Sequence, residues 1–498
     1  MPRLRALLLV VFALASPASL PAVETPRVTL VRTAASVRLS TGRAVAEVRL
    51  ARHRLRVQAG GKGLVREPAD GGLFYERAGA THQLGAVREG ITLDDGVRLL
   101  VDTDEGMPAT VRLRFSTRRA LEVTFVPPAP DTVTAIGARL LSPASEHIYG
   151  LTERLRDSPP LSPPVIDIPA DDIVPPEVGS LDRRGERVEM RVLPTFSVYA
   201  PFYQSSLGYG LAVSGTTFGV FDLARSDPGV IRFRFEAGTR AFPRDLVFHV
   251  LVGPDYATIL DEYTLLAGRP IVPPPWAFLH WRWRDALDPG TALLDGVAVN
   301  AQVADDVLMY EALGIPPGVY HFDRPVLQGN YGFARWAWDE TRLPNPQAML
   351  DALKHRGYRL MIWSGAWMCG SDPGDNGLEA QTLGFLAPRP TGAPPAAPFC
   401  DDVTGTDFIL DVTNPDARTW WQGKMVDFLR RYGIQGIKLD RGEEHIPSEA
   451  TDRWADGRTG REVRNDYARL QARIHHDALA EVWGDDFVLV SRPSYTGT

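Results

Sequence analysis

The sequence predicts a multidomain chain, an N-terminal β-sandwich followed by a (β/α)8 barrel that is incomplete within the printed residues. Three observations support this. Between residues 27 and 250, apolar and polar residues alternate in many short segments, the period of half-buried strands. Between residues 276 and 498, helical and strand patterns alternate, as in parallel α/β sheets. Residues 251–275 predict a stiff connector because they end in three consecutive prolines.

Length and charge limit the possible functions. The chain has 498 residues, enough for two or three domains. Its net charge of -7 gives no reason to expect a nucleic acid partner. With 44% apolar and 23% charged residues, the composition is that of a folded globular protein.

The N-terminus predicts an export signal over residues 1–22. Arg3 and Arg5 precede an apolar run at residues 6–15, and small residues follow. The run is too short to span a bilayer, although an N-terminal anchor is the alternative interpretation. We expect a periplasmic or extracellular protein without a later membrane span.

Two cysteines, Cys369 and Cys400, are the only ones in the chain. In an oxidising compartment they can form a disulfide, and an unpaired state is an equal alternative. No further ligand candidates lie near them, so we expect no structural zinc site.

The predicted sandwich strands include "AEVRL", "VRLRF", "LEVTF" and "IRFRF", each with strict alternation. A proline-rich stretch at residues 157–177 interrupts the pattern. It is either a surface excursion or a loop that reaches toward the neighbouring domain.

Two similar sequence segments, each a predicted helix followed by a predicted strand, indicate the barrel. "NPQAMLDALKHRG" predicts a helix with Asn345 as N-cap and an end at Gly357, and the strand "RLMIW" follows. "NPDARTWWQGKMVDFLRRYG" predicts a second helix, from Asn414 to Gly433, before the strand "IQGIKLD". "AFLHWRW", "GVYHFD" and "FVLVSR" complete five predicted strands. An open doubly wound sheet is the rival fold, but no glycine-rich phosphate turn follows the first strand.

Candidate functional residues occur where these strands end, which is where barrel enzymes place their chemistry. The ends lie at Asp323, Trp363, Asp440 and Arg492. Alternation puts His321 on the face of Asp323, and Lys438 on the face of Asp440. A neighbouring cation favours an ionised carboxylate, which can attack or stabilise a carbon that becomes cationic. The alternative is a salt bridge that only closes a strand end.

Several stretches resemble glycoside hydrolase family 31, the retaining α-glycosidases. They are "EHIYGLTER", "APFYQSSLGYGLAV", "VYHFDRP", "WAWDETRLPNPQAML", "DVTNPDARTWW" and "GIQGIKLDRGEEHIP". The resemblance implies a galactose-mutarotase-like sandwich followed by a TIM barrel. It implies that Asp440 is the catalytic nucleophile and that Glu443 supports it, with Glu444 as a departure from the family pattern. The substrate-binding residues that we expect are His321, Asp323, Trp363, Lys438, Arg492 and Asp182.

A retaining glycosidase also needs a general acid/base, with the two carboxyl groups about 5–5.5 Å apart. We find no residue for this role in the chain, because Asp485 and Asp486 precede the fifth barrel strand. We expect the acid beyond Thr498. The resemblance implies an α-glycoside or oligosaccharide substrate and neither metal nor cofactor. It leaves α-xylosidase, α-glucosidase and α-galactosidase activities open, as well as α-transglycosylation and a non-catalytic carbohydrate-binding relative.

Overall fold

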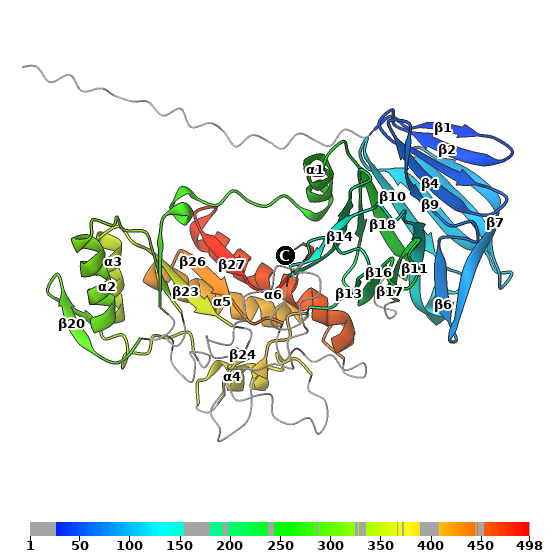
Figure 1. Cartoon of the computed structure of the whole chain (residues 1–498). Helices are drawn as coiled ribbons and strands as arrows, with labels where there is room; N and C mark the ends of the chain where they lie inside the picture. Colours follow the sequence, from blue (N-terminus) through cyan, green and yellow to red (C-terminus); the bar gives the residue numbers. More distant parts are fainter. Residues whose placement is uncertain are drawn as a thin grey trace, which may run out of the picture.

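The computed structural model of this chain describes residues 26–153, 180–192, 198–237, 244–284, 287–323, 327, 335–365, 367–370, 373–388, 408–443, 446 and 453–497. Figure 1 shows an antiparallel β domain beside a parallel sheet with helices. The predicted signal segment and the proline-rich stretch at residues 157–177 lie outside the described residues, and so does Glu444.

The N-terminal domain contains a 5-stranded sheet, β1 to β5 in order, and all but one of the strands of a larger 14-stranded sheet, whose remaining strand comes from the C-terminal end of the chain. Alternating side chains of these strands point into one core, as in β9, where Val111, Leu113 and Phe115 are buried. The strands of the domain are β1 (Thr29–Arg32), β2 (Ser36–Ser40), β3 (Val45–Arg49), β4 (Arg54–Ala59), β5 (Lys62–Arg66), β6 (Phe74–Arg77), β7 (Ala80–Leu93), β8 (Gly96–Thr103), β9 (Ala109–Phe115), β10 (Ala120–Val126), β11 (Val133–Leu141), β12 (Ile148–Thr152), β13 (Arg187–Met190), β14 (Val198–Ser205), β15 (Tyr209–Val213), β16 (Gly219–Leu223), β17 (Val230–Glu236) and β18 (Leu246–Val252). A 3-10 turn, η1, covers Pro130–Thr132.

Strand β7 makes the large sheet fold over on itself. Its first residues pair with β6 and its later residues pair with β8. At the start of its pairing with β8 the register shifts at Leu84/Val87 and again at Val87/Glu89. Such irregularities bend a strand and increase its twist, so the two halves of the sheet face each other as the layers of a sandwich.

The predicted connector contains a helix that the proline argument did not anticipate. Helix α1 (Tyr256–Ala267) begins at Asp255, whose side chain accepts a hydrogen bond from the Thr258 N–H. It packs Ile259 against the sandwich. Only after this helix does the chain extend into the prolines and a 3-10 turn, η3 (Pro275–Phe278).

The second domain has a 5-stranded parallel sheet with strand order β19-β22-β23-β26-β27. These five strands are the five that the sequence predicts. Neighbours in the sheet follow the order of the chain without a reversal, which is barrel order and not that of a doubly wound sheet. The strands are β19 (Trp281–Arg284), β22 (Val319–Phe322), β23 (Arg359–Ser364), β26 (Gly436–Leu439) and β27 (Val488–Ser491).

Within the described residues, five helices share one hydrophobic core with this sheet. They are α2 (Ala301–Ala312), α3 (Pro346–His355), α4 (Asn376–Leu383), α5 (Pro415–Tyr432) and α6 (Gly460–Trp483). The predicted cap of α5 is confirmed, because the Asn414 side chain accepts from the N–H groups of Asp416 and Ala417. Asn345 precedes α3 as predicted, but it adopts a left-handed conformation and its side chain does not cap the helix.

Five short strands complete the described strands of the second domain. Strands β20 (Thr291–Leu294) and β21 (Val297–Asn300) form a hairpin, and β24 (Trp367–Met368) pairs with β25 (Phe408–Ile409). Strand β28 (Ser494–Tyr495) leaves the barrel sheet and pairs in parallel with β14 of the sandwich. Figure 1 shows this last segment beside β14, so the two domains are joined by a shared sheet as well as by the chain.

Candidate active site

The ends of the barrel strands remain aligned for one residue beyond each strand. The N–H of Asp323 donates to the Arg284 carbonyl, the N–H of Asp440 to the Ser364 carbonyl, and the N–H of Arg492 to the Leu439 carbonyl. The residues directly after these strands therefore lie at the same edge of the sheet, at the same height along the strand direction. We call the following residues the strand-end cluster: His321, Asp323, Trp363, Lys438, Asp440, Glu443 and Arg492.

Asp440 lies at the centre of the cluster. Its Oδ2 accepts a hydrogen bond of 2.9 Å from the Trp363 indole N–H. Its Oδ1 accepts from the Arg441 N–H at 3.0 Å and lies 3.0 Å from Arg492 Nε. The Lys438 ammonium is 3.7 Å from Oδ2. Both carboxylate oxygens are thus oriented by donors from three different strand ends.

The surroundings keep this buried carboxyl group ionised. Burial by itself raises the pKa of Asp440, because a charge is poorly solvated there. The positive charges of Arg492 and Lys438 and the Trp363 hydrogen bond outweigh this effect, so the pKa is held below its ordinary value. The sequence predicted a cation beside Asp440, and the larger contribution comes from Arg492.

Lys438 has a closer partner than the one that its spacing suggests. Its Nζ donates to Asp323 Oδ2 at 2.8 Å. Strand β23 lies between the strands that carry these two residues. A side chain can cross an intervening strand only where the sheet curves, so this contact lies on the concave inner side of the barrel sheet. Asp323 is 1% exposed, which makes it an anchored acceptor.

Trp283 is a member of this site that the sequence reasoning missed. Its indole N–H donates to Asp323 Oδ2 at 2.6 Å. The signal was present, since Trp283 stands near the end of the first barrel strand, β19. Only the ends of the other four strands were used in the prediction. With an exposed fraction of 49%, the indole also offers an open ring face to a ligand.

His321 lies beside Asp323 without a close hydrogen bond to it, because the distance from its Nε2 to Asp323 Oδ2 is 3.7 Å. Burial lowers the pKa of His321 to about 4, although the Asp323 carboxylate opposes the shift. The imidazole is therefore neutral at neutral pH. In that state it can donate or accept a hydrogen bond and adds no third positive charge to the cluster.

Glu443 joins the cluster through Arg492, whose Nη2 donates to its Oε1. The Glu443 side chain is fully buried. Arg441, between Asp440 and Glu443, has a left-handed φ of 57°. Arg492 therefore contacts both the predicted nucleophile and the predicted supporting acid.

The hydrogen bonds of Asp182, in the described part of the chain, lie within the sandwich. The Asp182 carboxylate accepts from the Ile148 and Arg184 N–H groups and contacts His147 Nδ1 at 2.7 Å. Burial raises the pKa of Asp182, but the His147 contact and the backbone N–H donors lower it by more, so the carboxyl group is ionised. These contacts hold two neighbouring segments of the sandwich together, and none of them is to the strand-end cluster.

The exposure of the cluster indicates the side from which a ligand can approach. The Asp440 and Asp323 side chains are 8% and 2% exposed, whereas those of Lys438 and Arg492 are 29% and 32% exposed. Buried acids therefore stand behind cations that reach solvent. Such a site can hold hydroxyl groups with its charged side chains while a carboxylate remains unprotonated for reaction.

Three further predictions concern groups beyond the cluster. Cys369 is buried and disulfide-bonded, while Cys400, the partner that the sequence offers, lies outside the described residues. Within the described ranges, no group of three or more His, Cys, Asp or Glu side chains is arranged to hold a metal ion. In the same ranges, no helix is both long and apolar enough to cross a bilayer.

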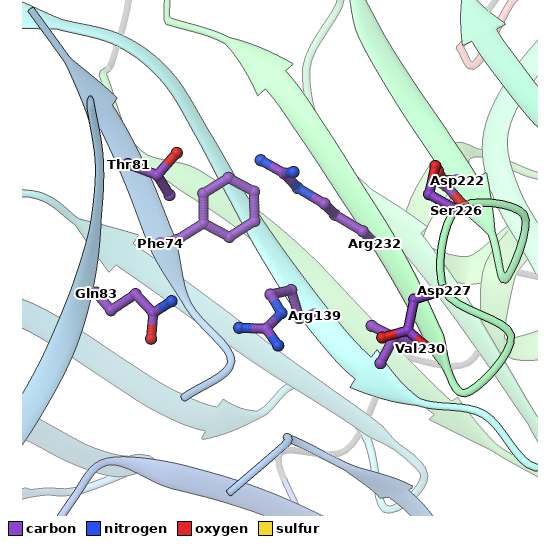
Figure 2. A pocket seen from close by; sticks show the side chains of 9 residues that line it. All are labelled: Phe74, Thr81, Gln83, Arg139, Asp222, Ser226, Asp227, Val230 and Arg232. Atoms are coloured by element: carbon purple, nitrogen blue, oxygen red, sulfur yellow. The ribbon is translucent and has the colours of Figure 1, made fainter. Parts of the chain in front are cut away.

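A second concentration of charges lies on the outer face of the sandwich, around a hollow of about 320 Å³. Figure 2 shows Arg139 and Arg232 side by side in it, and their strands place them directly opposite each other. Arg139 forms two hydrogen bonds with Asp70, and Arg232 lies 4.5 Å above the Phe74 ring. We call this region the sandwich hollow; it is lined by Phe74, Thr81, Gln83, Arg139, Asp222, Ser226, Asp227, Val230 and Arg232.

Comparison with known proteins agrees with the strand order of the second domain. Residues 270–498 match the description "Glycosyl hydrolases family 31 TIM-barrel domain". Alpha-xylosidase XylQ of Lactiplantibacillus pentosus is 27% identical over 304 residues, which are 59% of this chain and 35% of that protein. Isomaltosyltransferase of Sporosarcina globispora is 24% identical over 294 residues, 56% of this chain and 26% of its own. The chain thus spans about a third or less of these two relatives.

The fold is also similar to that of solved structures. The cycloalternan-forming enzyme from Listeria monocytogenes superimposes with a TM-score of 0.66 and 17% identity, over 92% of this chain and 48% of that chain. This likeness covers both domains and supports the assignment of a sandwich followed by part of a barrel. Residues 270–498 of this chain are a TIM-barrel domain of glycosyl hydrolase family 31.

Proposed function

We propose that the protein is a retaining α-glycosidase in which Asp440 is the nucleophile. The observation that carries this proposal is the state of that carboxylate, which is 6% exposed, has a lowered pKa and is oriented by Trp363, Arg492 and Lys438. A nucleophile must be ionised and held in position at the pH of the reaction. The family assignment supports the same role.

The reaction proceeds by two displacements. An oxygen of Asp440 forms a bond with the anomeric carbon while the bond from that carbon to the leaving oxygen breaks, and a general acid gives the leaving oxygen its proton. Water then attacks the same carbon, loses a proton to that acid's conjugate base and releases the carboxylate, so the configuration is retained. We assign the general acid to none of the described members of the strand-end cluster.

The other members of the cluster bind the sugar in this proposal. Asp323 accepts from sugar hydroxyl groups, as it already accepts from Lys438 and Trp283. Trp363 forms an aromatic wall, His321 contributes a neutral hydrogen-bonding group, and Arg492 aligns Glu443 with Asp440. Asp182 remains a proposed contributor from the sandwich.

The substrate that we favour is an α-xyloside or an α-glucoside, because the relatives are named as an α-xylosidase and an isomaltosyltransferase. An α-galactoside is less well supported. We further propose that the protein is exported to the periplasm or beyond, on the basis of Arg3, Arg5 and the apolar run after them. N-terminal sequencing of the protein from its native cells tests that location.

Trapping of the intermediate tests the nucleophile directly. The protein is incubated with 5-fluoro-α-D-xylopyranosyl fluoride or 5-fluoro-α-D-glucopyranosyl fluoride, and peptides are analysed by mass spectrometry. Fluoride leaves without protonation, so this step needs no general acid. The expected result is one glycosyl group bound to Asp440. A label on another carboxylate overturns the assignment.

The main alternative is a carbohydrate-binding relative that performs no catalysis. It predicts saturable binding of xylose- or glucose-containing oligosaccharides by calorimetry, without any covalent label from either fluoride. Transglycosylation uses the same intermediate, and transfer to an added acceptor sugar distinguishes it from hydrolysis.

A further inference from the structure

A buried arginine on helix α6 connects the sandwich to the loop after Asp440. Arg464 is 7% exposed. Its Nε donates to the Val192 carbonyl at 2.9 Å, its Nη1 to the Ile446 carbonyl at 2.8 Å and its Nη2 to the Glu443 carbonyl at 2.9 Å. One rigid guanidinium thus holds three backbone carbonyls from two separate parts of the chain.

The sandwich end of this connection is firmly anchored. Val192 and Met190 are both 0% exposed and belong to the sandwich core. The neighbouring residue on α6, Asn465, accepts from the Val192 N–H and donates to the Met190 carbonyl, each at 2.9 Å. Helix α6 therefore forms hydrogen bonds with three backbone groups of this segment, and these bonds restrict the position of Arg464 relative to the sandwich.

The other end of the connection is a loop that needs support. Arg441 adopts a left-handed φ of 57°, which costs free energy for a residue other than glycine. At Gly442, an added Cβ would lie 2.4 Å from Gln471 Oε1 and 3.0 Å from Pro493 Cγ, so the loop is packed tightly against α6 and against the segment after β27. Glu443 follows, with its carbonyl held by Arg464 and its carboxylate held by Arg492.

We propose that Arg464 is a positioning residue of the active site, through which the sandwich fixes the loop from Arg441 to Glu443 and so aligns Arg492 with Asp440. The contacts form a continuous path from Val192 through Arg464, Glu443 and Arg492 to Asp440. The role in catalysis rests on the proposed function, whereas the role in fixing the loop does not.

The matched control is Arg461, one turn earlier on the same helix. It also crosses the domain boundary, with two hydrogen bonds of 2.7 Å to Glu236 of the sandwich. It makes no contact with the loop in the described part of the chain. Arg461→Ala weakens the boundary and leaves the loop intact, so it separates a general loosening of the domains from a loss of positioning.

The experiment compares Arg464→Met, Arg464→Lys and Arg461→Ala with the unaltered protein, after thermal melts establish that each is folded at the assay temperature. With the 5-fluoro glycosyl fluorides, we expect Arg464→Met to slow the first-order labelling step by about 10²-fold, with an unchanged dissociation constant for the reagent. Arg464→Lys should label at an intermediate rate, because the three donors of an ammonium group share one nitrogen and cannot reproduce the spread of the guanidinium donors over three nitrogens. Arg461→Ala should label at the normal rate.

Amide hydrogen exchange over residues 440–443 gives a second measurement that needs no catalysis. We expect faster exchange in both Arg464 variants and unchanged exchange in Arg461→Ala. If the unaltered protein is never labelled but loop exchange is faster in the Arg464 variants, the proposed function is rejected. The proposal that Arg464 positions the loop then still stands. Normal labelling and normal exchange in folded Arg464→Lys and Arg464→Met overturn the proposal, as does an equal slowing in Arg461→Ala.

Discussion

The strand-end cluster of the barrel and the sandwich hollow contain the same kinds of side chains in very different surroundings. Each brings two cations close to carboxylates. In the cluster, the Asp440 side chain is 8% exposed and interacts with residues from three strand ends. In the hollow, Arg139 pairs with Asp70, whose side chain is 61% exposed. The Arg139–Asp70 pair at the hollow is exposed to water, whereas charges in the cluster converge on one buried group.

Residue type alone therefore does not identify a site, because burial sets the strength of each electrostatic interaction. In solvent, a carboxylate beside an arginine contributes about 0–1 kcal/mol to stability. In a desolvated setting, the same charges are screened less, and removal of one of them leaves the others unpaired. The cluster should therefore respond strongly to single substitutions and the hollow weakly.

The largest effect is expected for Asp440→Asn. An amide cannot form the glycosyl ester, so we expect the rate of hydrolysis of aryl α-glycosides to fall by a factor on the order of 10⁴ to 10⁶. The matched control is Asp222→Asn in the sandwich hollow, which should leave the rate unchanged. Equal losses in the two variants would show that the contrast between the regions is wrong.

Asp323→Asn is expected to have the next largest effect. It keeps an acceptor oxygen but removes the charge that receives the Lys438 and Trp283 donors. A hydrogen bond to a charged group contributes about 2 kcal/mol, so we expect kcat/KM for aryl α-glycosides to fall roughly 30-fold. A change below about twofold would mean that Asp323 only closes a structural ion pair.

The sequence predicted the members of the cluster well and their partners less well. Parallel strands end at one edge of a sheet, so the position of Asp323 after "VYHF" and of Asp440 after "IKL" was enough to bring them together. Alternation also placed Lys438 on the face of Asp440, but it does not reveal that Asp323, two strands away, is the closer partner. That contact depends on the curvature of the sheet, which no local pattern encodes.

The connections between the domains could not be predicted at all. Arg464 occurs in an amphipathic helix and has no spacing that marks it, and its partner Val192 precedes it by 272 residues. The pairing of β28 with β14 likewise depends on how the domains meet. The five barrel strands were predictable because each carries its own apolar pattern between helix ends.

Lys438→Met should change the pH dependence more than the maximal rate. Burial raises the pKa of Asp440, and Lys438 is one of the cations that lower it. Without that cation the pKa rises, so the carboxylate becomes protonated at a higher pH. We expect the acid limb of the labelling rate with a 5-fluoro glycosyl fluoride to move to higher pH. The control is Lys424→Met on α5, where the lysine pairs with Glu379.

The smallest effect is expected for Asp70→Asn, which removes the carboxylate partner of Arg139 at the sandwich hollow. The Arg139 hydrogen bond lowers the pKa of Asp70, so the pair stabilises the fold above the pKa of the unfolded chain. This contribution is lost as the pH falls through the lowered folded-state pKa. Because the pair is exposed, urea unfolding at pH 7 should show a loss of about 0–1 kcal/mol, and added salt should reduce it further. A loss of several kcal/mol would place the hollow in the same energetic class as the cluster and remove the distinction between the two regions.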